Sequence, residues 1–296
     1  VMTRMSGHDI DAVGIAHEGG EFCVSVVFVR GGRNLGSSNY FPKGGLGDED
    51  EMLAGFLAQY YLAREAPSEI VLSRPVEGAE ALEQALAQKA GHAVAIRSNV
   101  RGTRARWIEM ARNNAALGLK MRASSRATIA DQLDAVGREL SLGKTPQRIE
   151  CFDVSHSMGE SAVASCVVLG PEGPLKSDYR RFNLRNITPG DDYAGIEQAV
   201  ERRFARVMRG EAPMPDLLLI DGGLGQLHAA MAALARVGVT DLAVVSVAKG
   251  SDRRAGQERL FFPGQEAALI LADDSPALRL IQRVRDEAHR FAITGH

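Results

Sequence analysis

The sequence predicts an α/β fold, a mixed β-sheet flanked by helices, and three observations support this prediction. Strand-like and helix-like segments alternate in the same order in two stretches, residues 8–99 and 147–250. Asp221 closes an apolar Leu-Leu-Leu-Ile run and precedes a double glycine, which is typical of a strand that ends at the functional edge of a sheet. Asp153 interrupts the apolar strand at residues 149–155, where an unpaired carboxylate is costly to bury. Two such acids on adjacent strands repel each other unless a cation lies between them, so the pattern indicates a metal site.

The first stretch, residues 8–99, is predicted to contain five strands and two helices. Glycine-rich turns join the first three strands, and the first helix has its apolar residues at helical spacing. The strands are predicted at residues 12–16, 21–29, 35–41, 69–73 and 93–97, and the helices at residues 48–63 and 79–89.

Residues 100–146 are predicted to form a helical connector. Thr128 and Asp131 resemble a capping box, which predicts that a second helix starts there. Seven basic residues and one acid, Glu109, lie between positions 101 and 126. The basic residues could form a solvated helix face or a helix that contacts phosphates, and the pattern leaves both interpretations open.

The third stretch, residues 147–296, repeats the order of the first and adds a last helix that begins at Ser275-Pro276. Its strands are predicted at residues 149–155, 161–168, 177–183, 216–221 and 242–248, and its other helices at residues 192–209 and 226–237. Three hairpin-type strands, a helix, a strand, a helix and a strand are the order of the ribonuclease H-like fold. In that fold the first and fourth strands lie side by side and a C-terminal helix brings a third ligand. Asp153, Asp221 and His289 are therefore predicted to meet at one metal site.

These three residues suit metal-dependent hydrolysis of a phosphodiester. Carboxylate oxygens are preferred ligands of Mg²⁺ and Mn²⁺, and such a cation activates a water and stabilises charge on the phosphate. A neutral imidazole at His289 favours Mn²⁺ without excluding Mg²⁺, or else positions the water. Asp153, Asp221 and His289 are thus the candidate catalytic residues and the candidate metal ligands.

Each candidate also has a structural interpretation. Asp221 could cap the helix that follows it, and His289 could be an ordinary core or surface histidine. Asp192 could be a helix N-terminal acid that the helix dipole favours, with a supporting role at the site as its alternative. Several basic residues near the acids are candidate DNA contacts or ordinary surface charge. They are Lys176, Arg180, Arg181, Lys249, Arg253, Arg254 and Arg285.

Composition limits the class of protein. The chain has 296 residues, 45% of them hydrophobic and 24% charged, as expected for a globular protein of about two domains. There is no apolar stretch of membrane-spanning length and no signal peptide, so no membrane partner is expected. Cys23, Cys151 and Cys166 are dispersed, which favours a reducing compartment, the cytoplasm. The net charge is −2, so nucleic-acid binding requires local basic patches. The chain starts at Val1 without Met and ends at His296, so we expect a fragment of a longer protein.

Several segments resemble the UvrC family, whose members are incision subunits of the bacterial UvrABC nuclease. The segments are Cys-Phe-Asp-Val-Ser-His at 151–156, Ile-Thr-Pro-Gly-Asp-Asp-Tyr at 187–193, Leu-Leu-Leu-Ile-Asp-Gly-Gly-Leu-Gly-Gln-Leu at 217–227 and Arg-Asp-Glu-Ala-His-Arg-Phe-Ala-Ile at 285–293. The resemblance implies a ribonuclease H-like endonuclease at residues 147–296 that makes the 5′ incision in nucleotide excision repair. It implies damaged double-stranded DNA as substrate, UvrB as partner, and Asp153, Asp221 and His289 as the catalytic triad. In one departure, Leu224 stands where the family usually has Lys.

The resemblance also implies that other modules of the family lie outside this chain. These are the GIY-YIG nuclease, the helix-hairpin-helix pair, and the segment that binds UvrB, which is expected upstream of Val1. Residues 8–99 are expected to form a degenerate ribonuclease H-like domain. Gly14 stands where Asp153 stands in the third stretch, and Ser73 or Arg74 lies near the place of Asp221, so this domain is expected to bind no metal and to cut nothing.

Two other functions remain open. One is a non-catalytic nucleic-acid-binding or scaffold module on the same fold, and metal-dependent cleavage would distinguish it from a nuclease. The other is an RNA-cleaving relative, which a comparison of DNA and RNA substrates would identify.

Overall fold

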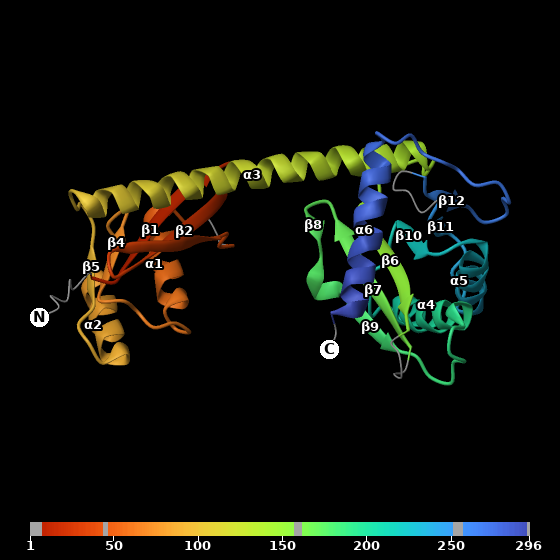
Figure 1. Cartoon of the computed structure of the whole chain (residues 1–296), viewed down its shortest axis with the longest axis horizontal. Helices are drawn as coiled ribbons and strands as arrows, with labels where there is room; N and C mark the ends of the chain where they lie inside the picture. Colours follow the sequence, from red (N-terminus) through yellow and green to blue (C-terminus); the bar gives the residue numbers. More distant parts are fainter. Residues whose placement is uncertain (1–7, 44–46, 157–161, 251–256, 295–296) are drawn as a thin grey trace, which may run out of the picture. The chain divides into compact units, whose positions relative to one another are not determined.

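The computed structural model describes residues 8–43, 47–156, 162–250 and 257–294 (Figure 1). The chain divides into two compact units, Val1–Ser124 and Ser125–His296. Each unit is built on a mixed sheet covered by helices, so the predicted fold class is confirmed.

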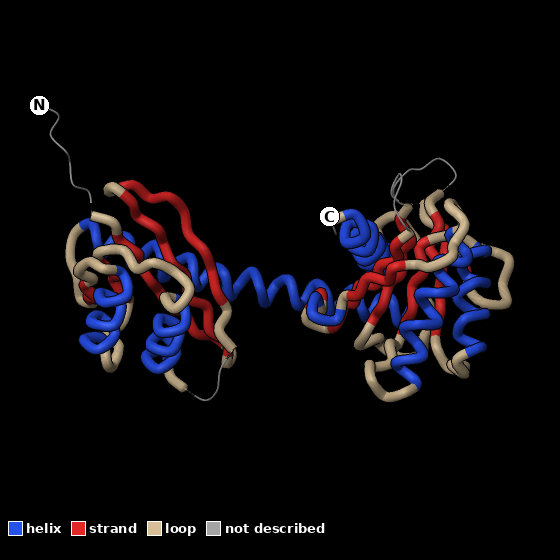
Figure 2. The backbone as a smooth tube through the Cα atoms, turned by 90° about the horizontal axis from the view of Figure 1, so that it is seen from below, coloured by secondary structure: helices blue, strands red, loops and turns tan. Residues whose placement is uncertain are grey.

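The first unit has a five-stranded sheet in the order β3-β2-β1-β4-β5. Strands β1 and β2 pair antiparallel, as do β2 and β3, whereas β4 runs parallel to β1 and to β5. Helices α1 and α2 pack on one face around Leu53 and Leu57, and α3 covers the other face through Ala111 and Ala115 (Figure 2). The elements are β1 Ile10–Glu18, β2 Glu21–Arg30, β3 Arg33–Tyr40, α1 Glu49–Tyr60, β4 Glu69–Leu72, α2 Ala79–Ala90 and β5 Ala95–Arg97.

Helix α3, Thr103–Glu139, runs for 37 residues without a break. Its first part packs on the sheet of the first unit, and Ile129, Leu133 and Val136 in its last part belong to the core of the second unit. The helix start predicted at Thr128 is therefore wrong. The apolar stripe continues past this residue at helical spacing, and packing of that stripe outweighs a weak local capping signal. The predicted connector, residues 100–146, thus contributes to two cores.

The second unit has a seven-stranded sheet in the order β12-β11-β10-β6-β7-β8, with β9 also paired to β7. Strand β10 runs parallel to both β6 and β11, and the other pairs are antiparallel. Helices α4 and α5 cover one face and α6 lies on the other (Figure 1). The elements are β6 Ile149–Ser155, β7 Val163–Gly170, β8 Gly173–Pro174, the 3₁₀ turn η1 Lys176–Asp178, β9 Arg180–Asn183, α4 Asp192–Met208, β10 Leu217–Asp221, α5 Leu224–Arg236, β11 Ala243–Ala248, β12 Arg259–Phe261 and α6 Pro276–Ile293.

In each unit the first strand has the parallel neighbour that the ribonuclease H-like order predicts. Strand β4 lies beside β1, and β10, which is the fourth strand when the two-residue β8 is not counted, lies beside β6. Within the described parts of the chain, no helix combines the length and the apolar character that crossing a membrane requires.

Candidate metal centre

The two predicted acids lie at the ends of adjacent parallel strands. Phe152 of β6 pairs with Ile220 of β10, so the next residues along each strand, Asp153 and Asp221, stand side by side. Asp153 is only 6% exposed, and Asp221 is half-buried at the tip of its strand. The prediction that the sheet brings these carboxylates together therefore agrees with the strand register.

The two carboxylates are electrostatically unfavourable neighbours. Burial, followed by repulsion from Asp153, raises the pKa of Asp221 to about 6. Burial also raises the pKa of Asp153, and its hydrogen bond with His289 opposes that shift. Desolvation and like charge both disfavour the ionised pair, and a cation between the oxygens would relieve both effects.

His289 reaches the acids from α6. The hydroxyl of Ser165 on β7 donates to the carbonyl oxygen of Ala288 at 2.8 Å, which ties this turn of α6 to the sheet. His289 Nδ1 lies 3.1 Å from Asp153 Oδ2, and 63% of the His289 side chain remains exposed. The imidazole therefore sits at the open side of the carboxylate pair.

The turn after Asp221 shows that this residue does not cap the next helix. Helix α5 begins at Leu224 with Gly223 as its N-cap residue, and Gln226 Oε1 accepts a hydrogen bond from the Gly223 amide at 2.9 Å. Gly222 has φ +142°, and a Cβ there would lie 2.5 Å from atoms of the Gln226 side chain, so the position favours glycine. Leu224 is half-buried and packs against the core.

Two basic candidates, Lys249 and Arg285, act electrostatically on Asp221, since each lowers its pKa. Arg285 is only 8% exposed and lies 3.6 Å from Glu258, so it is placed beneath the site and not on the surface. Its Nη1 atom is buried and has no hydrogen-bond partner among the residues that the structure describes.

The other described candidates lie on or next to several different elements of the second unit. Asp192 is the first residue of α4, and its carboxylate is hydrogen-bonded to His156, which follows β6. Arg181 donates to the carbonyl oxygen of Phe291, two residues beyond His289. Arg180 bonds to carbonyl oxygens near its own strand, and Lys176 is exposed on η1. Arg253 and Arg254 lie outside the described residues.

The donor set at this edge fits a hard divalent cation, because it consists of two carboxylates and one imidazole. Among the described residues, no three His, Cys, Asp or Glu side chains are already grouped to hold one ion. The carboxylate pair is thus the assembled part of the site, and His289 joins it through its bond to Asp153.

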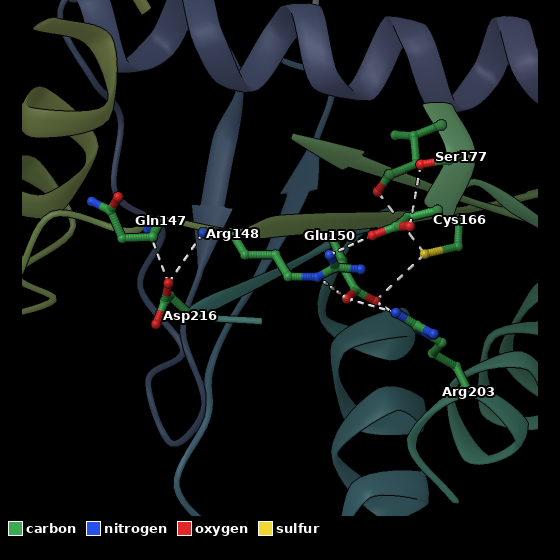
Figure 3. Close-up of polar contacts among 9 residues, drawn as sticks. Gln147, Arg148, Glu150, Cys166, Ser177, Arg203 and Asp216 are labelled. Carbon is green, nitrogen blue, oxygen red and sulfur yellow. Dashed lines mark hydrogen bonds and ion pairs between the residues drawn. The ribbon is translucent and has the colours of Figure 1, made fainter. Parts of the chain in front are cut away.

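A buried ion cluster in the same unit was not predicted from the sequence. Glu150 on β6 is fully buried and binds Arg203 of α4 at 2.9 and 3.0 Å, and Arg148 lies 3.0 Å from the same carboxylate (Figure 3). Arg148 also pairs with Asp178 at 2.6 Å. The available signal was a second mid-strand acid, three residues before Asp153. The cluster fixes α4 against the face of β6 opposite to α6.

The first unit has no room for a carboxylate at the corresponding place. Val13 pairs with Leu72, so Gly14 and Ser73 occupy the register positions of Asp153 and Asp221. A Cβ at Gly14 would lie 2.5 Å from the backbone nitrogen of Arg112 and 2.6 Å from the carbonyl carbon of Ala111. Helix α3 therefore lies directly against the strand where the acid would stand.

The strand order and the acids at the tips of the first and fourth strands define the class of protein, a ribonuclease H-like protein. Two family models agree with this class. Residues 137–293 match the UvrC RNAse H endonuclease domain, and residues 9–122 match the UvrC Ribonuclease H-like domain. The chain belongs to the UvrC family.

Curated relatives give the same family. The chain is 49% identical over 290 residues to the UvrABC system protein C of Alkalilimnicola ehrlichii, and 49% identical over 292 residues to that of Pseudomonas putida. Each alignment covers 97% of this chain and 48% of the relative, so the chain spans about half the length of the relatives it matches.

Solved structures share less with the chain. Ciona intestinalis endonuclease V in complex with DNA is 14% identical, with a TM-score of 0.34 over 59% of this chain and 95% of that chain. Marinitoga piezophila Argonaute in complex with a guide RNA is 7% identical, with a TM-score of 0.27 over 66% of this chain and 29% of that chain. The family assignment rests on the family models and the curated relatives.

Proposed function

We propose that the second unit is a DNA endonuclease that uses a divalent metal ion, Mg²⁺ or Mn²⁺. In this proposal it makes the 5′ incision in bacterial nucleotide excision repair, on damaged double-stranded DNA, in the cytoplasm and together with UvrB. The observation that carries the proposal is the pair formed by Asp153 and Asp221, whose burial and mutual repulsion raise the pKa of Asp221 to about 6. Such a pair is destabilising in itself and favourable once a cation binds.

Asp153, Asp221 and His289 are the proposed metal ligands and catalytic residues. A bound divalent cation supplies a nucleophilic water and stabilises charge on the phosphate. The carboxylates hold the ion at the strand tips, while His289, oriented by its bond to Asp153, ligates the ion or positions the water at the exposed side. Asp192 is proposed to support this edge through its hydrogen bond with His156.

Residues 8–99 are proposed to form a domain that neither binds metal nor cleaves DNA. Its register positions for the two acids carry Gly14 and Ser73, and α3 packs against Gly14. The strand order that it shares with the second unit supports an origin by duplication. Its proposed role is packing, DNA positioning or contact with a partner.

The proposal is tested with Asp153→Asn and Asp221→Asn, with Asp241→Asn as the matched control because Asp241 is an exposed acid in the connection between α5 and β11. Cleavage of an end-labelled, singly damaged DNA duplex is measured with Mn²⁺ in the presence of UvrB, and Mn²⁺ binding is measured separately by calorimetry. Each site variant is expected to lose at least about 100-fold in cleavage rate and to lose high-affinity Mn²⁺ binding. An Asp153→Asn protein that cleaves like the control would refute the assignment.

The same assay separates the alternatives. A scaffold module would show no metal-dependent cleavage in the unaltered chain, and an RNA-cleaving relative would prefer an RNA strand of the same sequence. The family membership supports the DNA endonuclease over both.

A further inference from the structure

A hollow of about 440 Å³ runs along strand β9 and helix α4 on the second unit, and arginines line most of it. Phe182 and Ala205 complete the lining, and none of the described residues that line the hollow is acidic. The arginines are Arg180, Arg181, Arg202, Arg203, Arg206 and Arg209. Arg202, Arg206 and Arg209 follow one another at helical spacing, so they form one stripe on α4.

One of the six arginines is neutralised inside the protein. Arg203 is 5% exposed and bound to Glu150, which also binds Arg148 (Figure 3). Arg148 in turn pairs with Asp178. The positive charges of the two arginines in that cluster equal the negative charges of its two acids, so the cluster has no net charge. Arg203 is thus a structural residue, and the other five arginines are exposed.

The exposed five carry an excess of positive charge. Arg180, Arg181 and Arg202 donate to the carbonyl oxygens of Ser177, Phe291 and Asn183, and these contacts neutralise no charge. Arg206 and Arg209 share a single acid, Glu211. About four positive charges are therefore left on one face of a chain whose total net charge is −2.

The guanidinium groups are also held in place. Arg181 lies over the ring of Phe291 with 3.9 Å to the centroid, and Arg202 lies over Phe182 at 5.4 Å. Stacking and carbonyl bonds fix the orientation of a guanidinium and leave other N–H groups free, which suits bidentate contact with phosphate.

Arg181 is the lining residue that faces the same side of the sheet as the candidate metal centre, whereas the arginines of α4 lie on the opposite side. Across the sheet, Asp153 pairs with Ser165, and Ser165 pairs with Arg181. Two strand spacings separate the backbones of Asp153 and Arg181, which is about 10 Å. A DNA strand advances about 3.4 Å along the helix axis for each nucleotide, so the backbone of Arg181 lies within about three nucleotides of Asp153.

We propose that this β9–α4 surface is a binding site for the phosphodiester backbone of nucleic acid. The inference deepens the proposed function and rests on it for the identity of the nucleic acid. Five exposed arginines without lining acids match a polyanion, and phosphate contacts dominate the affinity of such complexes.

The test is the triple variant R202Q/R206Q/R209Q in this chain. Its matched control is R33Q/R138Q/R279Q, which removes the same charge from exposed positions on β3, α3 and α6. Binding of a fluorescein-labelled DNA duplex is measured by anisotropy in EDTA over a range of salt concentrations, after thermal melts have shown that both variants are folded. The α4 variant is expected to bind at least about tenfold more weakly, with a salt slope smaller by about 2 to 3, while the control stays close to the unaltered chain.

Equal losses of DNA affinity in the two triple variants would show that only the total charge matters, and this would overturn the proposal. Unchanged DNA affinity in the α4 variant would also overturn it. A duplex RNA of the same sequence serves as a second probe, and a preference for it would overturn the DNA assignment alone. The α4 variant should bind Mn²⁺ like the unaltered chain in calorimetry, because its three substitutions leave the proposed metal ligands in place. Failure of the binding surface is thereby separated from failure of the nuclease proposal.

Discussion

At the residue scale, folding and metal binding favour different protonation states of Asp221. The metal-free fold is more stable with a protonated carboxyl, whereas a metal ion binds the ionised carboxylate. In the absence of a cation, the ionised carboxylate is held in a partly desolvated place beside Asp153, and its pKa rises to about 6. A group whose folded-state pKa is raised binds its proton more tightly in the folded state than in the unfolded state. The proton therefore stabilises the fold, and ionisation of Asp221 weakens it.

Asp221→Asn is accordingly expected to stabilise the metal-free protein. Below about pH 4 both states of the unaltered protein are protonated at this position, so the two proteins should be similar. As the pH rises through about 6 the unaltered protein loses stability, and the variant, which cannot ionise, should exceed it by on the order of 1–2 kcal/mol above about pH 7. Urea unfolding in EDTA at several pH values measures the difference.

Asp241→Asn controls for the loss of one negative charge, because Asp241 is exposed. Adding Mn²⁺ should reverse the order of stability, since only the unaltered site gains binding free energy. A variant that is less stable than the unaltered protein at neutral pH, without metal, would contradict this account of the site.

At the element scale, the contact of α3 with β1 depends on Gly14. A Cβ at this position would lie within 2.6 Å of two backbone atoms of α3, and backbone cannot rotate away as a side-chain end can. Gly14→Ala is therefore expected to lower the free energy of unfolding by at least about 2 kcal/mol, the cost of overpacking a tight contact.

The matched substitution is Gly55→Ala in α1, where a new Cβ would meet nothing within 4 Å. Alanine is favoured over glycine inside a helix, so this variant should gain up to about 1 kcal/mol. Thermal melts of the two variants give the comparison. Equal stability of Gly14→Ala and Gly55→Ala would show that α3 does not rest on β1 as the structure has it.

The elements that could be predicted from the sequence are those marked by a pattern within their own residues, such as an apolar run. The strands at 149–155 and 216–221 are apolar runs broken by one acid, and the strand order followed from their spacing, so the meeting of Asp153 and Asp221 was predictable. Strand β12 was not predicted because its three residues, Arg259–Phe261, are too few to show an alternating hydrophobic pattern. The unbroken α3 was missed because tertiary packing on two cores decided it, against a local capping pattern at Thr128.

The arginine stripe of α4 was not predictable for a related reason. Arg202, Arg206 and Arg209 share α4 with the acids Glu197 and Glu201, so the charges of the helix look like those of an ordinary solvated face. Arg236 of α5 lies 2.9 Å from Glu201 and also pairs with Glu197, which separates these acids from the stripe. Only the pairing of β9 beside α4 adds Arg180 and Arg181 to the same surface.

At the scale of the whole molecule, the chain combines a basic surface with a net charge of −2. The rest of the chain is then negative by about six charges, and this excess repels DNA wherever the basic surface is not in contact. Repulsion and attraction are both screened by salt, but the attraction also gains from release of counterions as phosphates are neutralised.

The chain by itself is therefore expected to bind undamaged duplex weakly and with steep salt dependence. Dissociation constants should lie in the micromolar range or above at physiological salt, because a few arginine contacts supply the binding. Affinity should fall by at least about tenfold between about 50 and 200 mM salt. Anisotropy titrations of a labelled duplex in EDTA measure both quantities. Nanomolar binding at physiological salt would mean that contacts other than these phosphate contacts dominate, and that the charge distribution of the chain does not control its affinity for DNA.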